Sequence, residues 1–247
     1  TWSLTKATAD DGQEALPLSD AVSGSLTDSG GSITFKSSGS YTLTATAVNS
    51  AGRETVYSQT VTVYPLIDVG FDLPETTHTD KSIMLAFSLE ELYGHDIVWS
   101  AAKDGEAAQP TDILEGGLGN EGGTFVFRSK GEYMLTASIT DETGRVFTHT
   151  ESTKVYPVAG IAFELPAASH TDTTLDVSTN LTEADGLTVD WSLTKNGEAA
   201  EELADELEGA LTNDGGKIRF RDKGVYRLTG TLTDETGRTF ETSGTLT

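Results

Sequence analysis

One stretch of sequence occurs three times along the chain, and it constrains the fold more than any other feature. Residues 224–238 read Gly-Val-Tyr-Arg-Leu-Thr-Gly-Thr-Leu-Thr-Asp-Glu-Thr-Gly-Arg, and residues 131–145 and 39–53 repeat this text closely. The aromatic and β-branched residues of the first part favour a β-strand, and Asp-Glu-Thr-Gly is typical of a tight turn. The tyrosines of the three copies are spaced by 92 and 93 residues, at Tyr41, Tyr133 and Tyr226. That period is too long for a solenoid repeat and is the size of a small β-sandwich.

Aligning the copies divides the chain into three modules, residues 1–63, 64–155 and 156–247. In the second and third modules, short runs of alternating apolar and polar residues are separated by Gly, Asn, Asp and Pro. This pattern is typical of antiparallel strands with one buried face. We therefore predict an all-β fold, a tandem and elongated array of antiparallel immunoglobulin-like β-sandwiches.

The first module is shorter than the other two. It begins at Trp2, whereas two strand-like segments precede the corresponding Trp99 and Trp191. A sandwich without these strands leaves core side chains and strand edges uncovered. We expect either that residues upstream of this sequence supply the strands, or that another chain completes the module by donating a strand.

The joints between modules contain no Gly/Ser tract. They are marked by Tyr64-Pro65 and Tyr156-Pro157. Proline fixes its own φ and biases the preceding residue toward extended geometry. The joints therefore predict a semi-rigid array in which neighbouring repeats of the same chain are partners.

The charge balance excludes several partners. The chain has 16 Lys and Arg against 39 Asp and Glu, a net charge of −23. Such a field repels nucleic acid and anionic lipid, so we predict no nucleic-acid binding. No apolar run approaches the ~20 residues of a membrane helix, which predicts no membrane insertion in this segment. The chain has no cysteine, so disulfides, zinc-thiolate sites and cysteine nucleophiles are excluded.

The residues Trp191-Ser192, Gly224 to Thr229 and Thr233 to Gly237 resemble the polycystic-kidney-disease-type (PKD) domain and its bacterial immunoglobulin-like relatives. Those domains have a tryptophan strand, a Gly-x-Tyr-x-Val/Leu-Thr strand and an Asp-x-x-Gly turn. The chain departs from their usual Trp-Asp-Phe-Gly-Asp-Gly, because serine follows each tryptophan here. The resemblance implies extracellular spacer or adhesive modules of large bacterial surface proteins, and it implies no catalytic residues.

Acidic residues crowd one loop of the third module. The candidates for a Ca²⁺ site are Glu201, Glu202, Asp205 and Glu206. Carboxylate oxygens are suitable Ca²⁺ ligands, but the spacing matches no Asp-x-Asp-x-Asp-Gly loop. A short exposed helical turn over residues 199–207 explains the same pattern, and charge runs are usually solvated. Calcium is the one cofactor that the sequence suggests, and no catalytic residue is predicted.

Two triplets match each other, His78-Thr79-Asp80 and His170-Thr171-Asp172. A His-Asp pair could bind a metal or orient a general base. No serine or cysteine nucleophile pattern lies nearby, which favours a local turn that caps a strand.

Three lysines, Lys6, Lys103 and Lys195, each follow a tryptophan by four residues. Asn49, Asp141 or Asp234 could lie across the sheet from them, which suggests an intramolecular amide bond between a lysine and one of these side chains. Such bonds need burial, and Lys103 and Lys195 border predicted hairpin turns. We therefore expect them to be solvated.

These features favour a non-enzymatic protein outside the cell. The first hypothesis is a structural stalk or spacer of a large bacterial cell-surface or adhesin-type protein, which projects a distal functional domain. The alternative is an adhesive module that binds a glycan or host protein through the loop after each tryptophan.

Overall fold

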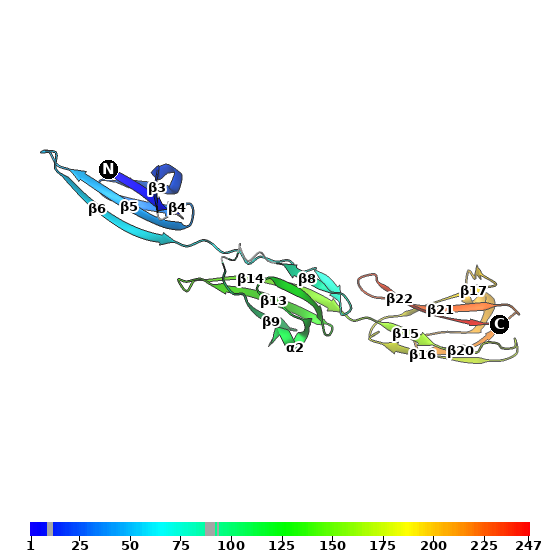
Figure 1. The fold of residues 1–247 in the computed structure, drawn as a ribbon. Helices are drawn as coiled ribbons and strands as arrows, with labels where there is room; N and C mark the ends of the chain where they lie inside the picture. The colour runs from blue at the N-terminus through cyan, green and yellow to red at the C-terminus, as the bar shows by residue number, and fades with distance from the viewer. Residues whose placement is uncertain (9–11, 87–91, 93) are drawn as a thin grey trace. The chain divides into compact units, whose positions relative to one another are not determined.

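The computed structural model describes residues 1–8, 12–86, 92 and 94–247, and antiparallel strands make up most of its regular structure (Figure 1). The chain divides into two compact units, Thr1–Asp68 (unit 1) and Val69–Thr247 (unit 2). The predicted all-β fold of antiparallel sheets is confirmed. No helix in the described part of the chain is long and apolar enough to span a membrane.

Unit 1 contains two sheets, with strand orders β2-β1-β5-β6 and β3-β4. Its elements are β1 (Trp2–Ala7), β2 (Gln13–Leu16), α1 (Leu18–Ala21), β3 (Val22–Thr27), β4 (Gly30–Phe35), β5 (Gly39–Val48) and β6 (Glu54–Val63). Leu4 and Tyr41 from the first sheet and Val22 from the second form its buried core, together with Ala21.

Unit 2 contains two successive sandwiches. The first comprises β7 (Thr76–His78), β8 (Ile83–Ala86), β9 (Val98–Lys103), β10 (Glu106–Ala108), α2 (Pro110–Ile113), β11 (Leu114–Gly116), β12 (Gly122–Phe127), β13 (Gly131–Thr140) and β14 (Val146–Tyr156). The second comprises β15 (Gly160–Phe163), β16 (Leu175–Thr182), β17 (Val189–Lys195), β18 (Glu198–Ala199), α3 (Leu203–Glu206), β19 (Leu207–Gly209), β20 (Gly215–Phe220), β21 (Tyr226–Thr233) and β22 (Thr239–Leu246).

The repeated strand forms the centre of one sheet in each sandwich. β13 lies between β9 and β14, and β21 lies between β17 and β22. Along β13 the buried residues alternate with more exposed ones, which is the period of two expected of a strand with one face on the core. The opposite sheets, β11-β12-β8 and β15-β16-β20-β19, supply the other half of each core.

The repeated tyrosines join the two sheets of each sandwich. The Tyr133 ring lies 4.3 Å from Phe127 of the opposite sheet, and Tyr226 lies 4.3 Å from Phe220 in the same way. Each tyrosine is at most 1% exposed. Their hydroxyls donate to the backbone carbonyl four residues earlier, at 2.8 Å for Tyr133 and 2.9 Å for Tyr226. The ring is thus fixed by apolar contact at its faces and by a hydrogen bond at its tip, as in the tyrosine corner of immunoglobulin domains.

The tryptophans of unit 2 pack at the cores and are only partly buried. Trp191 packs against Phe163 at 5.1 Å, and Trp99 packs against Phe71 at 5.4 Å. The indole Nε1 of Trp191 donates to the carbonyl of Thr212 at 3.1 Å. Because the indole N–H needs a hydrogen-bond acceptor, the Trp191 ring lies at the edge of the core. Its bond to Thr212 connects the loop that contains Thr212 to the core.

In the described part of unit 1, no ring covers Trp2 as Phe71 covers Trp99 and Phe163 covers Trp191 in unit 2. In the β7–β14 sandwich, Phe71 contacts both Trp99 and His149. The aligned positions in unit 1 are Trp2 and Tyr57, and they line a groove of about 590 Å³. Tyr57 is 70% exposed, and β6 is exposed at every residue from Glu54 to Thr62. One face of unit 1 is therefore uncovered within the described part of the chain.

We expect the hydroxyl of Tyr133 to stabilise its sandwich. Tyr133→Phe removes the bond to the Ser129 carbonyl and should lower the free energy of opening by about 1 kcal/mol, measured by amide hydrogen exchange in β13. The control is Tyr57→Phe, which changes an exposed residue and should stay within about 0.5 kcal/mol of the parent. Equal exchange in both variants would contradict this role.

We also expect that unit 1 is stabilised when the segment that precedes Trp191 in the third module is added before Thr1. A copy of residues 156–189 fused before Thr1 would place its Phe163 against Trp2. Burying one phenylalanine should add about 1.5–3 kcal/mol to the unfolding free energy of unit 1. The readouts are thermal denaturation and the fluorescence of Trp2. The same fusion with Phe163→Ser in the added copy is the control, and equal stability of the two fusions would show that the groove is not completed in this way.

Candidate functional site

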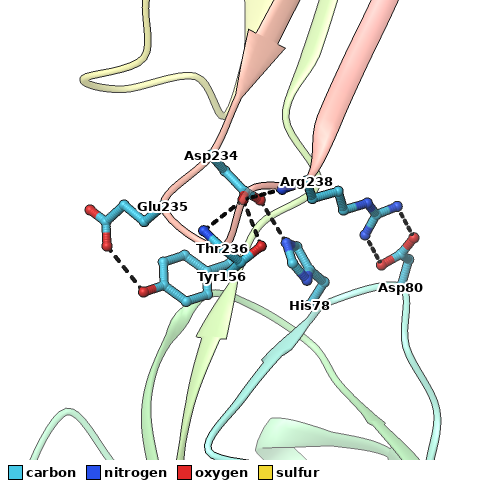
Figure 2. A network of polar contacts seen from close by, with 7 residues as sticks. All are labelled: His78, Asp80, Tyr156, Asp234, Glu235, Thr236 and Arg238. Atoms are coloured by element: carbon cyan, nitrogen blue, oxygen red, sulfur yellow. Dashed lines mark hydrogen bonds and ion pairs between the residues drawn. The ribbon is translucent and has the colours of Figure 1, made fainter.

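The candidate site lies where the two sandwiches of unit 2 meet. Two segments at one end of the β7–β14 sandwich contact a single hairpin turn of the β15–β22 sandwich (Figure 2). That turn, residues 234–238, joins β21 to β22 and is the last part of the repeated stretch.

The turn is built on the side chain of Asp234. Its Oδ1 accepts hydrogen bonds from the backbone N–H of Thr236 and Arg238, at 2.9 and 3.0 Å, and from the Thr236 hydroxyl at 2.6 Å. Gly237 has a φ of 84°, which glycine adopts without strain. The turns at Asp141 and Asn49 have the same side-chain bonds to the second and fourth residues after them. In each case one side-chain oxygen accepts the backbone N–H groups of the turn. The other terminal atom of the same side chain remains available to a different partner.

The partner of Asp234 comes from the other sandwich. β7 pairs in parallel with the end of β14, so that His78 lies beside Tyr156. The His78 Nε2 lies 2.7 Å from Asp234 Oδ2, and both side chains are less than 10% exposed. Since the carboxylate can only accept, Nε2 carries the proton of this bond. The imidazole ring also lies 5.9 Å from the ring of Tyr156, so the pair is shielded by the joint itself.

Two further sets of contacts surround the His78–Asp234 pair. The guanidinium of Arg238 donates two hydrogen bonds to Asp80, at 2.7 and 2.6 Å. Lys154 and the Tyr156 hydroxyl both donate to Oε2 of Glu235, at 3.1 and 3.0 Å. A bidentate arginine–carboxylate pair fixes direction as well as distance, so the turn is held on both sides of Asp234.

The electrostatics of the site favour the ionised carboxylates. Burial raises the pKa of Asp234, but hydrogen bonds from His78, Thr236 and the backbone outweigh burial and lower it to about 2. The side-chain hydrogen bond from Arg238 lowers the pKa of Asp80. Glu235 is exposed, and its bond from Lys154 lowers its pKa in the same direction. Because solvent screens the Glu235 contacts, the buried His78–Asp234 pair and the paired Arg238 hold the two sandwiches together most strongly.

The other predicted site residues lie elsewhere. Glu202 precedes α3, Asp205 and Glu206 lie within it, and Glu201 is exposed. Glu206 accepts from Lys195 at 2.7 Å and from the Tyr226 hydroxyl at 3.2 Å. Among the described residues, no group of three or more His, Asp or Glu side chains is placed to hold a metal ion. The structure thus gives Glu206 an ion pair instead, and calcium binding stays a prediction from the sequence.

The lysines are far from the aspartates considered as amide-bond partners. Lys195 lies opposite Tyr226 at the start of β21, whereas Asp234 follows the end of that strand. A strand rises about 3.3 Å per residue, which places the two side chains roughly 26 Å apart. No amide bond can form between them.

Sequence reasoning found both halves of this junction but not their pairing. The His-Thr-Asp triplet and the Asp-Glu-Thr-Gly-Arg turn were each recognised as repeated turns. His78 and Asp234 are 156 residues apart in the chain. The His-Thr-Asp triplet and the Asp-Glu-Thr-Gly-Arg turn each occur once in the second module and once in the third. This shared recurrence is the sequence pattern that could have indicated a contact between them.

No family model matches the chain, and no match was found among curated proteins. Among solved structures, an I-band fragment of titin is 14% identical, with a TM-score of 0.47, and the alignment covers 100% of this chain and 87% of that fragment. The insect immune protein hemolin is 17% identical, with a TM-score of 0.42 and coverage of 100% and 67%. The N-terminal eight Ig domains of Down Syndrome Cell Adhesion Molecule are 13% identical, with a TM-score of 0.44 and coverage of 99% and 36%.

The fold is immunoglobulin-like. Each sandwich of unit 2 has two antiparallel sheets and a buried tyrosine whose hydroxyl donates to the backbone carbonyl four residues earlier, as immunoglobulin domains do.

We expect the His78–Asp234 pair to make unit 2 sensitive to acid. The pKa of Asp234 in the folded state, about 2, lies below its ordinary value of 3.8. Its stabilisation is therefore fully present above about pH 4 and is lost as the pH falls from 4 to 2, by roughly 2 kcal/mol in total. Carbon-13 NMR titration of the carboxyl group measures this pKa directly.

His78→Ala should raise the pKa of Asp234 toward 3.8, because it removes the bond to Oδ2 and leaves the turn intact. Asp141, in a turn of the same construction, is the internal control and should titrate unchanged. An unchanged Asp234 pKa in this variant would mean that the turn alone determines it.

Proposed function

We propose that this chain is part of a non-catalytic spacer, the stalk of a large extracellular protein of the bacterial cell-surface or adhesin type. Its tandem modules hold a distal functional domain away from the surface. The observation that carries the proposal is the junction between the β7–β14 and β15–β22 sandwiches. A spacer must transmit direction as well as length, and this junction restricts direction.

Three features of the junction support this role. Only residues 157–159 separate β14 from β15, and Pro157 restricts the backbone at the start of this connection. Ala159 is 5% exposed, so the connection packs against protein and not against solvent. The His78–Asp234 and Asp80–Arg238 contacts then tie the turn to the other side of the joint. A covalent connection and a set of directional polar contacts at separate points oppose bending about the joint.

The charge of the chain also fits this role. A net charge of −23 keeps a long repeated protein soluble and disfavours lateral association of identical modules. Specific contacts between modules then form at their ends, where charges of both signs meet. The negatively charged flanks of like modules repel one another.

The adhesive alternative needs exposed aromatic or other large apolar side chains in the loops after the tryptophans. In unit 2 these loops are the hairpin turns at Asp104-Gly105 and Asn196-Gly197. Among the described residues, the exposed large apolar side chains are Val48, Val56, Tyr57, Val61, Tyr64, Leu66, Met84, Val98, Met134, Val146, Val158 and Val225. Of these, Val225 lies beside the Asn196 turn, with which its backbone forms two hydrogen bonds. Neither of the two exposed aromatic residues in this set, Tyr57 and Tyr64, lies at these turns.

The spacer proposal predicts a narrow range of orientations between the two sandwiches. Because the chain has no cysteine, single cysteines at the exposed positions Glu115 and Asp205 would carry spin labels without background. Pulsed electron resonance should give one narrow distance distribution in the parent. The variant His78→Ala/Asp80→Ala should broaden it while both sandwiches remain folded.

Asp172→Ala is the matched control, because Asp172 aligns with Asp80 but lies outside the junction. It should leave the distribution unchanged. A broad distribution in the parent would contradict the proposal, since a freely bending joint cannot project a distal domain in a defined direction.

A further inference from the structure

The far end of the β15–β22 sandwich carries one half of a second junction. The triplet His170-Thr171-Asp172 repeats His78-Thr79-Asp80. We name the surface formed by His170, Asp172, Lys223 and Val225 the His170 surface. His170, Lys223 and Val225 line an open groove of about 560 Å³ at this end of the sandwich.

The loop that carries His170 shares two backbone bonds with the loop that carries His78. The N–H of Thr247 donates to the Ala167 carbonyl at 3.1 Å, as Lys154 does to Glu75 at 3.1 Å. The N–H of Thr173 donates to the His170 carbonyl at 3.0 Å, as Lys81 does to His78 at 3.0 Å. The His78 loop is held in addition by the pairing of β7 with the end of β14 at Tyr156. The turn that carries His170 is therefore formed without a docked partner, and the strand pairing beside it is not.

What distinguishes the two loops is occupancy. His78 is 7% exposed because the Asp234 turn lies against it, whereas His170 is exposed. Asp80 binds Arg238 through two hydrogen bonds, whereas the Asp172 side chain accepts only from the neighbouring Thr173 hydroxyl at 3.3 Å. Across the described residues, no ion pair reaches the side chain of His170 or Asp172.

The structure also shows what fits such a surface. The Asp-Glu-Thr-Gly-Arg turn occurs at residues 141–145 and 234–238, and both copies have the same bonds within the turn. In both copies the arginine side chain lies over the ring two residues later, at 4.8 Å for Arg145 and 5.0 Å for Arg238. The turn thus presents a carboxylate oxygen and a guanidinium in a fixed relation, complementary to an imidazole N–H and a carboxylate.

We propose that the His170 surface is a docking site for the Asp-Glu-Thr-Gly-Arg turn of a further module of this type, joined after it. His170 donates to the aspartate of the incoming turn, and Asp172 receives its arginine in a bidentate pair. The inference rests on the geometry of the observed junction and does not depend on the spacer role.

Among the contacts of the observed junction, the one made by Lys154 is changed in the second half. The residue aligned with Lys154 is Thr247, so the glutamate of the incoming turn loses an ammonium partner. That ion pair is solvent-exposed at the observed junction, and exposed pairs add little. The imidazole–carboxylate and arginine–carboxylate contacts therefore determine the docking. A covalent connection supplies the high local concentration that these few contacts need.

The experiment extends the full chain with a copy of residues 155–247 directly after Thr247, which keeps the 93-residue spacing of the repeat. Nitrogen-15 NMR then follows the exchange of the ring N–H of His170 with solvent. In the extended chain this exchange should slow by roughly tenfold relative to the parent, which is the expected effect of one buried hydrogen bond. His78, which is bonded in both proteins, is the internal reference.

The matched control is the same extension with Asp234→Asn in the added copy, which keeps Oδ1 for the bonds of the turn and removes the acceptor of the His170 N–H. This variant should exchange His170 as fast as the parent. If His170 exchanges fast in the extended chain while the added copy is folded, no docking occurs and the proposal is overturned. Protection that persists in the Asp234→Asn extension overturns it equally, since it would come from some other contact.

Discussion

The arrangement of the two sandwiches in unit 2 depends on the carboxylate of Asp234, whose two oxygens have separate tasks. Oδ1 accepts the side-chain bonds that close the β21–β22 turn, and Oδ2 accepts from His78 of the other sandwich. The turn is therefore rigid before it docks, so that little conformational entropy is lost when the junction forms. The same division allows one residue to serve both the local fold of a module and its position relative to its neighbour.

Stability and orientation are carried by different parts of the structure. Each sandwich is stabilised by its buried aromatic and aliphatic side chains, of which Tyr133, Phe127 and Leu135 are at most 1% exposed. The junction adds few apolar contacts, and its strength lies in the direction of its hydrogen bonds. It can be weakened without unfolding either sandwich, since local openings draw on the contacts of one region only. The length of each module and the stiffness of the junction between modules therefore depend on different residues.

The fold could be predicted from the sequence because its signal is local and repeated. The alternation along Tyr226, Leu228 and Leu232 directly gives the buried face of β21. The partial burial of the tryptophans depends on loop carbonyls such as that of Thr212, which no periodicity reveals.

The site was harder to predict because its contacts join distant segments. Nothing in the alternation tells which end of a sandwich a loop occupies. That information comes from the parallel pairing of β7 with β14, which puts His78 at the end that faces the next sandwich. The acidic run at residues 201–206 stays a predicted cation site. Its composition does not reveal that Glu206 pairs with the nearby Lys195.

The two halves of the junction lie at opposite ends of a sandwich, so the contact is head-to-tail. A head-to-tail contact between like modules does not close on itself and can be repeated without limit. Its specificity then depends on the residue at the first position of the turn. In unit 1 this residue is Asn49, whose Oδ1 accepts the bonds of the turn as Asp234 does. The remaining group is an amide nitrogen, which donates and carries no charge. It cannot accept from a His N–H as Oδ2 of Asp234 does, so the turn of unit 1 keeps the shape of the docking element and lacks its chemistry.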